Sequence, residues 1–224
     1  MNQNILIFDT ETTGLPKFKK NMYKKESNPF NDYHSPSQYK YYDGSRLIEL
    51  GYLIYNSNRE LILSKSILIK PDRFLIQNSN IHGIEHDFAS QNGKVISEVL
   101  KEFAQDITSC NTLVAHNLPF DFHILLSECY RFVVNTPNGL LSSPPEIQII
   151  INKFKVMEKF CTMTDGMRIM NLTRRPKLSV LYQDLTKNTW EQKHRAEDDA
   201  KACAECYWKL LDIQKDNYQK LINT

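Results

Sequence analysis

Residues 4–15, NILIFDTETTGL, contain a continuous apolar run that leads directly into two carboxylates. A run without polar alternation is typical of a strand that is buried on both faces in the middle of a sheet. Asp9 and Glu11 follow at the end of this strand, and their spacing of two places both side chains on one face. Carboxylates in a dry site usually need a divalent cation. The pair therefore predicts a metal site, with a solvated strand end as the alternative.

Two further acids lie in segments that are expected to be helical. Asp199, in HRAEDDA (residues 194–200), shares a helical face with apolar residues such as Cys203 and Leu210, so it should point toward the core. Its neighbour Asp198 falls on another face. Asp121, in AHNLPFDFHIL (residues 115–125), lies in the first turn of a helix opened by Pro119. An acid at a helix N-terminus can also be explained by the helix dipole alone.

The remaining periodicity predicts an α/β layer architecture. Strand-like runs occupy residues 47–56 and 61–70, with a turn at 56–58, and they form a plausible hairpin beside the first strand. Residues 113–115 and 159–162 are expected to be short strands. Helices are predicted over residues 94–108, from Pro119 onward, over 178–185 and over 195–214, and an exposed loop over 135–145. Together they predict a mixed sheet flanked by helices.

Composition limits the class of protein. The 224 residues, 41% of them hydrophobic, can form one domain over residues 1–224. A net charge of +2 neither demands nor excludes a nucleic-acid partner. Five cysteines in an irregular pattern suit a reducing compartment rather than a disulfide framework. The first apolar run is too short for a signal peptide, and no run suits a membrane span. We therefore expect a soluble intracellular protein, most simply cytoplasmic, with no membrane partner.

A long irregular segment, residues 16–45, separates the first strand from the hairpin. It contains six lysines against three acids, together with five tyrosines. Loops of this length are usually functional or disordered. Lysines interleaved with tyrosines could bind a phosphate backbone and stack on bases. The alternative, which the sequence favours slightly, is a solvated loop.

Three motifs in order resemble those of a known family. DTETTGL, AHNLPFDFHIL and HRAEDDA are similar to the three exonuclease motifs of the DnaQ-like 3′→5′ exonucleases. The subclass is the one called DEDDh, whose last motif is His-x-Ala-x-x-Asp and which includes the proofreading epsilon subunit of DNA polymerase III. RLIELGYLIYN, IHGIEH and MRIMNLTRRPKLSVLYQDL are weaker matches in the family's order. The likeness covers nearly the whole chain.

The resemblance implies an RNase H-like fold with a central mixed five-stranded sheet, and a catalytic site. The metal-binding acids would be Asp9, Glu11, Asp121 and Asp199, holding two Mg²⁺ or Mn²⁺ ions that clamp the scissile phosphate. His194 would be the general base, a role that suits imidazole. The product would be a nucleoside 5′-monophosphate released from the 3′ end.

The resemblance also implies substrate contacts. The backbone of Thr12 would contact the terminal sugar, and Leu15 would wedge against the last bases. His116, Asn117 and Phe120 would line the same cleft. Core packing is the alternative for Leu15 and Phe120.

Several functions are compatible with these motifs. The leading hypothesis is a stand-alone exonuclease that acts on single-stranded, frayed or mismatched DNA 3′ ends. The same chemistry on RNA, as in ribonuclease T or oligoribonuclease, is a close alternative, because no residue indicates whether a 2′-OH is read. A non-catalytic nucleic-acid or polymerase-binding module is disfavoured, because all four acids and the histidine are present. A polymerase or replication partner in trans stays open.

Overall fold

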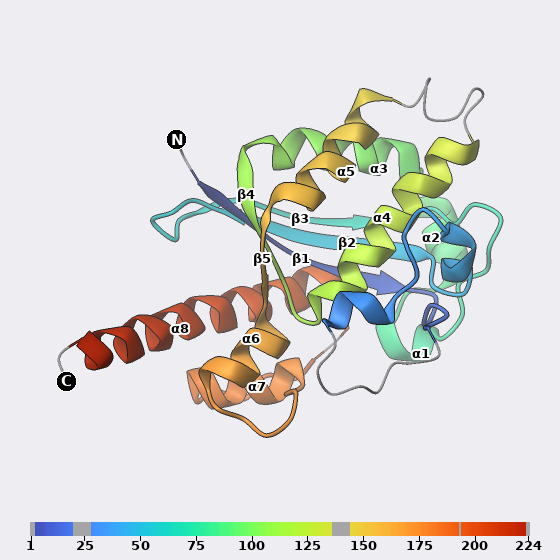
Figure 1. Cartoon of the computed structure of the whole chain (residues 1–224). Coiled ribbons are helices and arrows are strands. Elements are labelled where there is room, and N and C mark those ends of the chain that lie inside the picture. Colours follow the sequence, from blue (N-terminus) through green and yellow to red (C-terminus); the bar gives the residue numbers. More distant parts are fainter. Residues whose placement is uncertain (1–2, 20–27, 136–143, 193, 223–224) are drawn as a thin grey trace.

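The computed structural model describes residues 3–19, 28–135, 144–192 and 194–222, and its centre is one mixed sheet (Figure 1). The strand order is β3-β2-β1-β4-β5. β2 is antiparallel to both β1 and β3, whereas β4 is parallel to β1 and β5. The strands are β1 (Asn4–Thr12), β2 (Leu47–Tyr55), β3 (Leu61–Leu68), β4 (Cys110–Ala115) and β5 (Glu158–Cys161). The predicted mixed five-stranded sheet with the first strand at its centre is confirmed.

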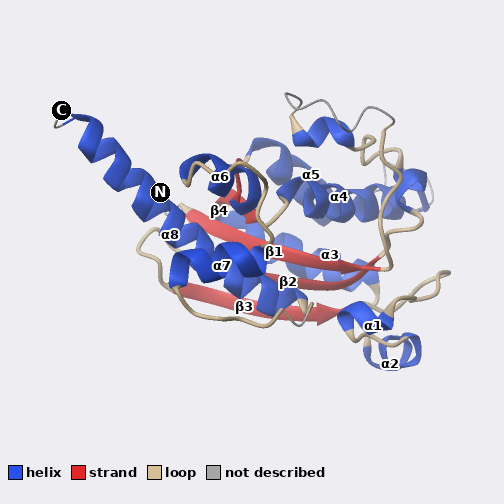
Figure 2. Cartoon of the chain, turned by 90° about the horizontal axis from the view of Figure 1, so that it is seen from below, coloured by secondary structure: helices blue, strands red, loops and turns tan. Residues whose placement is uncertain are grey.

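Helices cover both faces of this sheet (Figures 1 and 2). One layer consists of α3 (Ile96–Asp106), α4 (Leu118–Asn135) and α5 (Pro145–Val156). The other consists of α6 (Thr162–Ile169), α7 (Leu178–Thr186) and α8 (Ala196–Ile222). Short helices α1 (Ser79–His82) and α2 (His86–Asn92) lie near the end of the sheet where β1 finishes. No helix in the described ranges is both long and apolar enough to cross a bilayer.

Side-chain alternation along β1 explains why two layers are needed. Leu6 and Phe8 belong to the core under α3, α4 and α5, whereas Ile5 and Ile7 belong to the core under α7 and α8. Successive residues of a strand point to opposite faces, so a strand without polar residues must be covered on both. Asp9 and Glu11, which follow Phe8, therefore lie at the end of β1 that both helix layers cover.

Part of the predicted insertion folds against α4. Its described residues include two 3-10 helices, Pro29–Asp32 and Tyr39–Tyr42. Tyr33 and Tyr42 are buried in the core, and the Tyr33 ring stacks on that of His123 with centroids 4.7 Å apart. The expectation of a merely solvated loop is wrong at these positions, because the two rings supply core surface. They are equally unavailable for stacking on bases. Residues 20–27, with Tyr23, lie outside the described residues.

Candidate metal and active site

The acids of the first and last motifs meet on one face of the sheet. Glu11 lies in β1, and Asp199 lies in the first turn of α8, where it is only 4% exposed. Glu11, His194 and Asp199 each offer one ligand atom, and these atoms all lie within 4.8 Å of one another. Residues separated by more than 180 positions in the chain thus form one candidate cation site.

Asp121 reaches the same strand end from the opposite helix layer. It is 2% exposed, and its Oδ1 accepts hydrogen bonds from the Thr10 backbone N–H at 3.0 Å and from Thr10 Oγ1 at 2.7 Å. β4 pairs with β1 only as far as Ile7. Beyond Ile7 the Asp121 side chain, rather than β4, accepts a backbone hydrogen bond from β1. Thr10 therefore orients Asp121, a role that the sequence did not reveal.

The electrostatics show that the four carboxylates crowd one another. Burial, followed by the charges of Asp121, Asp199 and Glu11, raises the pKa of Asp9 well above its ordinary value. Burial is also the main cause that raises the pKa of Glu11 to about 8, of Asp121 to about 7 and of Asp199 to about 6. Like charges and desolvation both favour the neutral acid unless a cation is present.

These residues fit a divalent cation. Asp199 Oδ1 is buried and accepts no hydrogen bond from any described residue, while its Oδ2 accepts one from Gln192 Nε2 at 2.5 Å. A buried carboxylate oxygen without a donor is costly, and carboxylate oxygens are the ligands that Mg²⁺ and Mn²⁺ prefer. The four acids could therefore hold metal, with His194 beside them.

We expect the metal-free protein to lose stability as the pH rises from about 5 to 8. The folded-state pKa values of Glu11, Asp121 and Asp199 lie above the ordinary carboxyl values, so the folded chain binds more protons than the unfolded chain in this window. Their contribution is present at low pH and is lost through the folded pKa values of about 6 to 8. Thermal unfolding in chelator across this range measures the effect.

Added Mn²⁺ should reverse this trend, because a cation stabilises the ionised acids. The rise in Tm on adding Mn²⁺ should be larger at pH 8 than at pH 6, with each 1 kcal/mol giving about 2–4 °C in a chain of this size. Asp121→Asn should reduce both the pH slope and the metal effect. A flat Tm between pH 5 and 8 combined with no response to Mn²⁺ would contradict the site.

An ion pair between buried Glu49 and half-exposed Arg195 fixes the entrance of α8. Glu49 of β2 is fully buried and accepts hydrogen bonds from Arg195 Nε and Nη2, and from the backbone N–H of Ala196 at 3.0 Å. His194, immediately before, has a left-handed backbone with φ of 50°. Such a conformation in a non-glycine residue persists where its surroundings hold it. Glu49 thus helps to place His194. In the sequence, the feature that could have indicated this role is a single acid inside an otherwise apolar strand.

Gly51 permits the close approach of α8 to the sheet. It pairs with Asp9 across β1 and β2. A Cβ at Gly51 would lie 2.2 Å from both Ala196 C and Glu197 N. Only glycine therefore allows the first turn of α8, which carries Asp199, to pack directly beside Asp9.

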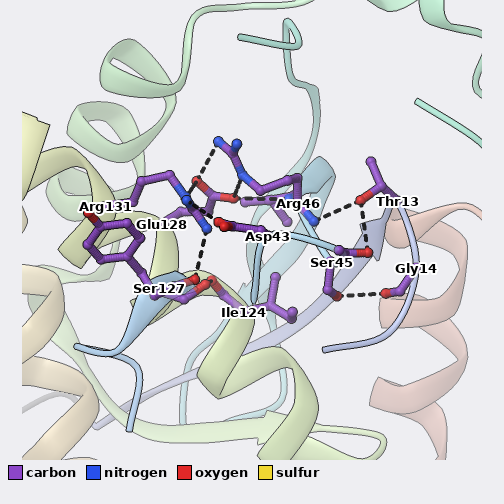
Figure 3. A network of polar contacts seen from close by, with 12 residues as sticks. Thr13, Gly14, Asp43, Ser45, Arg46, Ile124, Ser127, Glu128 and Arg131 are labelled. Carbon is purple, nitrogen blue, oxygen red and sulfur yellow. Dashed lines mark hydrogen bonds and ion pairs between the residues drawn. The ribbon is translucent and has the colours of Figure 1, made fainter. Parts of the chain in front are cut away.

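The turn after β1 is tied to α4 by polar contacts (Figure 3). Ser45 Oγ donates to the carbonyl oxygen of Gly14 at 2.6 Å, and the Arg46 backbone N–H donates to Thr13 Oγ1 at 2.9 Å. Arg46 in turn forms a bidentate pair with Glu128 of α4, with distances of 2.7 and 3.1 Å. The turn is thereby held rigidly relative to the acids.

Two of the predicted substrate residues flank this turn. Thr12 ends β1, and its hydroxyl donates to the Gly14 carbonyl at 2.8 Å. Leu15 is 71% exposed, so its side chain remains available to a ligand. Core packing is therefore wrong for Leu15.

The other three lie just before α4 or in its first turn, and His116 and Phe120 already have protein partners. His116 contacts Thr162 Oγ1 through Nδ1 at 2.9 Å and the Pro176 carbonyl through Nε2 at 3.2 Å. Asn117 lies close enough to Tyr33 to lower the pKa of its phenol, and Phe120 packs partly buried against the main core. Desolvation lowers the pKa of His116 to about 4, so the ring stays neutral and keeps these contacts. All three residues lie within five positions of Asp121, at the same end of α4.

Comparison with known proteins gives a family and a fold. A family model named RNase_T and described as an exonuclease matches residues 6–207. No curated protein sequence matches the chain.

Solved structures of exonuclease I are similar in fold. The Escherichia coli enzyme in complex with a dT13 oligonucleotide has a TM-score of 0.61 and 15% identity over 98% of this chain and 43% of that one. Its complex with 5cy-dT13 gives 0.62 and 14%, over 100% and 44%. A moderately thermophilic exonuclease I from Methylocaldum szegediense gives 0.57 and 13%, over 93% and 40%. The chain therefore spans less than half the length of these proteins.

Proposed function

The chain belongs to the RNase_T family of exonucleases, and we propose that it is a metal-dependent 3′→5′ exonuclease of the DEDDh type. We propose that it acts on single-stranded, frayed or mismatched DNA ends and releases nucleoside 5′-monophosphates. The observation that carries the proposal is the convergence of Asp9, Glu11, Asp121 and Asp199 on one strand end, where they raise one another's pKa. Crowded acids of this kind are typical of functional sites.

In this proposal the four acids hold two divalent cations, Mg²⁺ or Mn²⁺. When bound, the cations supply Lewis-acid stabilisation of a phosphodiester transition state. Thr10 keeps Asp121 in place through its two hydrogen bonds. Glu49 and Gly51 keep the first turn of α8, and hence Asp199, against β1. The chain's own contribution is therefore a rigid set of ligands.

His194 accepts the proton of the attacking water in the proposed reaction. Its ring lies within 4.8 Å of ligand atoms of Glu11 and Asp199 and is only partly buried, so it can reach a water beside them. Leu15 wedges against the last bases, and the backbone of Thr12 contacts the terminal sugar. Asn117 and Phe120, beside Asp121, form the opposite wall. Wedging of this kind tolerates any sequence.

DNA is favoured because the fold is shared with exonuclease I solved in complex with deoxyoligonucleotides. The test compares 5′-labelled single-stranded DNA, duplex DNA with a 3′ mismatch, and RNA, each with Mg²⁺, Mn²⁺ or chelator. Shortening of the labelled strand one nucleotide at a time, abolished by chelator, is the expected result. Release of the labelled 5′ nucleotide first, or degradation that resists chelator, would contradict the proposal. Faster digestion of RNA would move the substrate assignment to the exoribonucleases.

His194→Ala should slow hydrolysis by about 10²–10⁴-fold, the usual contribution of a general base. It should leave the Mn²⁺-induced rise in Tm largely intact, because the four acids remain. Single-turnover hydrolysis and thermal unfolding on the same preparation separate the two roles. Equal losses of metal-induced stabilisation and of rate would instead make His194 a metal ligand.

A further inference from the structure

We propose that the loop between α6 and α7, residues 170–177, binds the phosphate backbone of the single strand that leads into the active site. The contacts come from Arg174, Arg175 and Lys177. This inference rests on the proposed function and extends it, because it assigns a binding surface for nucleotides beyond the terminal one.

The first observation is that this loop carries charge without partners. Arg174, Arg175 and Lys177 are exposed, and within the described ranges no carboxylate lies within 4 Å of their cationic atoms. Several other cations around the site are neutralised. Arg46 pairs with Glu128, Arg195 with Glu49, and Arg168, on the neighbouring helix α6, with Asp165. An unpaired cation can bind a phosphate without first breaking an ion pair.

The second observation is that the loop is anchored to the residues that precede α4. Pro176 is buried, and its carbonyl oxygen lies 3.2 Å from His116 Nε2. The other ring nitrogen of His116 lies 2.9 Å from Thr162 Oγ1 at the start of α6. A neutral imidazole with Nε2–H donating satisfies both contacts. His116 thus connects the loop to the turn that begins α4, five residues before Asp121.

The third observation is that the charge of Arg175 acts on Tyr33, which packs against α4. Burial is the main cause that raises the pKa of the Tyr33 phenol, and the charge of Asp121 adds to it, while Asn117 and the charge of Arg175 lower it. The charges of Asp121 and Arg175 thus both reach the phenol of Tyr33, which agrees with the placement of the loop beside the start of α4 that the His116 contacts give.

The geometry favours an extended nucleic-acid strand as the ligand. A cluster of negative carboxylates repels a free anion, but the metal ions that they bind attract the 3′-terminal phosphodiester. The next phosphates of that strand lie farther from the metal ions, where separate cations on an anchored loop can neutralise them. Contacts of this kind are independent of base sequence and weaken with salt.

The test compares Arg174→Ala/Arg175→Ala with Arg168→Ala as the matched control. Arg168 is an exposed arginine on the adjacent helix that is already paired with Asp165. The affinity for a fluorescent dT12 strand is measured in chelator at several KCl concentrations. The double variant should bind about tenfold more weakly at 0.1 M KCl, and its log–log salt slope should fall by about 0.7 for each phosphate that is no longer neutralised. Arg168→Ala should match the parent.

A second readout uses substrate length. The double variant should cleave a dinucleotide as fast as the parent but lose about tenfold in kcat/KM on dT12, because a dinucleotide has no upstream phosphates to bind. Salt slopes and dT12 kinetics equal to those of Arg168→Ala would overturn the inference. Binding is measured without metal and therefore does not depend on hydrolysis. A parent that binds dT12 but never hydrolyses it would contradict the proposed function, while the binding role of the loop could still be tested.

Discussion

Asp199→Asn should abolish exonuclease activity, with kcat falling by about 10³-fold or more. The amide cannot supply the charge that holds a divalent cation, and a bound cation contributes several kcal/mol of transition-state stabilisation. Each loss of about 1.4 kcal/mol is tenfold in rate. The metal-free variant should meanwhile be as stable as the parent at pH 8, or more stable. Burial already disfavours the charged form of Asp199, as its pKa of about 6 shows.

Asp198→Asn is the matched control for this experiment. It makes the same chemical change one residue away on the same helix, but the Asp198 side chain is 47% exposed and lies 4.0 Å from Lys201 Nζ. We expect its activity to stay within about twofold of the parent, since surface pairs contribute little. Rates for both variants and Mn²⁺ binding by calorimetry make the comparison. Comparable activity in the two variants, or Mn²⁺ binding by Asp199→Asn as tight as in the parent, would remove Asp199 from the site.

The choice of Asp199 over Asp198 shows what sequence alone can supply. Helical phase placed Asp199 inward, and the structure buries it at 4% exposure. The unbroken apolar run of residues 5–8 likewise predicted a central strand, because only burial on both faces explains the lack of alternation. The family match confirms the resemblance to the DnaQ-like exonucleases that the motifs indicated.

Other features could not be predicted from local sequence patterns. Helix α5 contains the run IQIII, which periodicity does not distinguish from a buried strand. Helix α8 continues past residue 214, the predicted end, to Ile222. Tyr33 and Tyr42 look like loop residues until α4 packs on them. Tertiary contacts outweigh the local pattern for the two tyrosines, whereas the end of α8 is exposed and continues the helix without burial.

The residues that support the site were missed for the same reason. Thr10 matters because Asp121, 111 positions later, accepts its two hydrogen bonds. Glu49 matters because it caps a helix that begins 147 positions later. Local sequence gives the ligands of a motif, whereas the groups that orient them are defined by the fold.

Gly51→Ala should damage both stability and activity, although residue 51 contacts no substrate. The new methyl group would lie 2.2 Å from backbone atoms of Ala196 and Glu197, which cannot rotate away as a side chain could. Overpacking of this kind costs about 1–3 kcal/mol, or roughly 2–4 °C in Tm for each kcal/mol. To relieve the contact, the first turn of α8 must move away from β2. That displacement separates Asp199 from Asp9 and Glu11, and a misplacement of about 1 Å can cost about 10²-fold in rate.

Gly44→Ala separates this steric effect from a general intolerance of alanine. The nearest atom to a Cβ at Gly44 is the Leu15 carbonyl oxygen at 3.5 Å, an ordinary contact, and its backbone is not left-handed. We expect Gly44→Ala to change stability by no more than about 0.5 kcal/mol. Thermal unfolding, hydrolysis rates and the Mn²⁺-induced rise in Tm should all separate the two variants. If Gly51→Ala retained parental activity and metal response, close packing of α8 on β2 could not be what assembles the four acids, and the Glu49–Arg195 pair would have to hold the helix by itself.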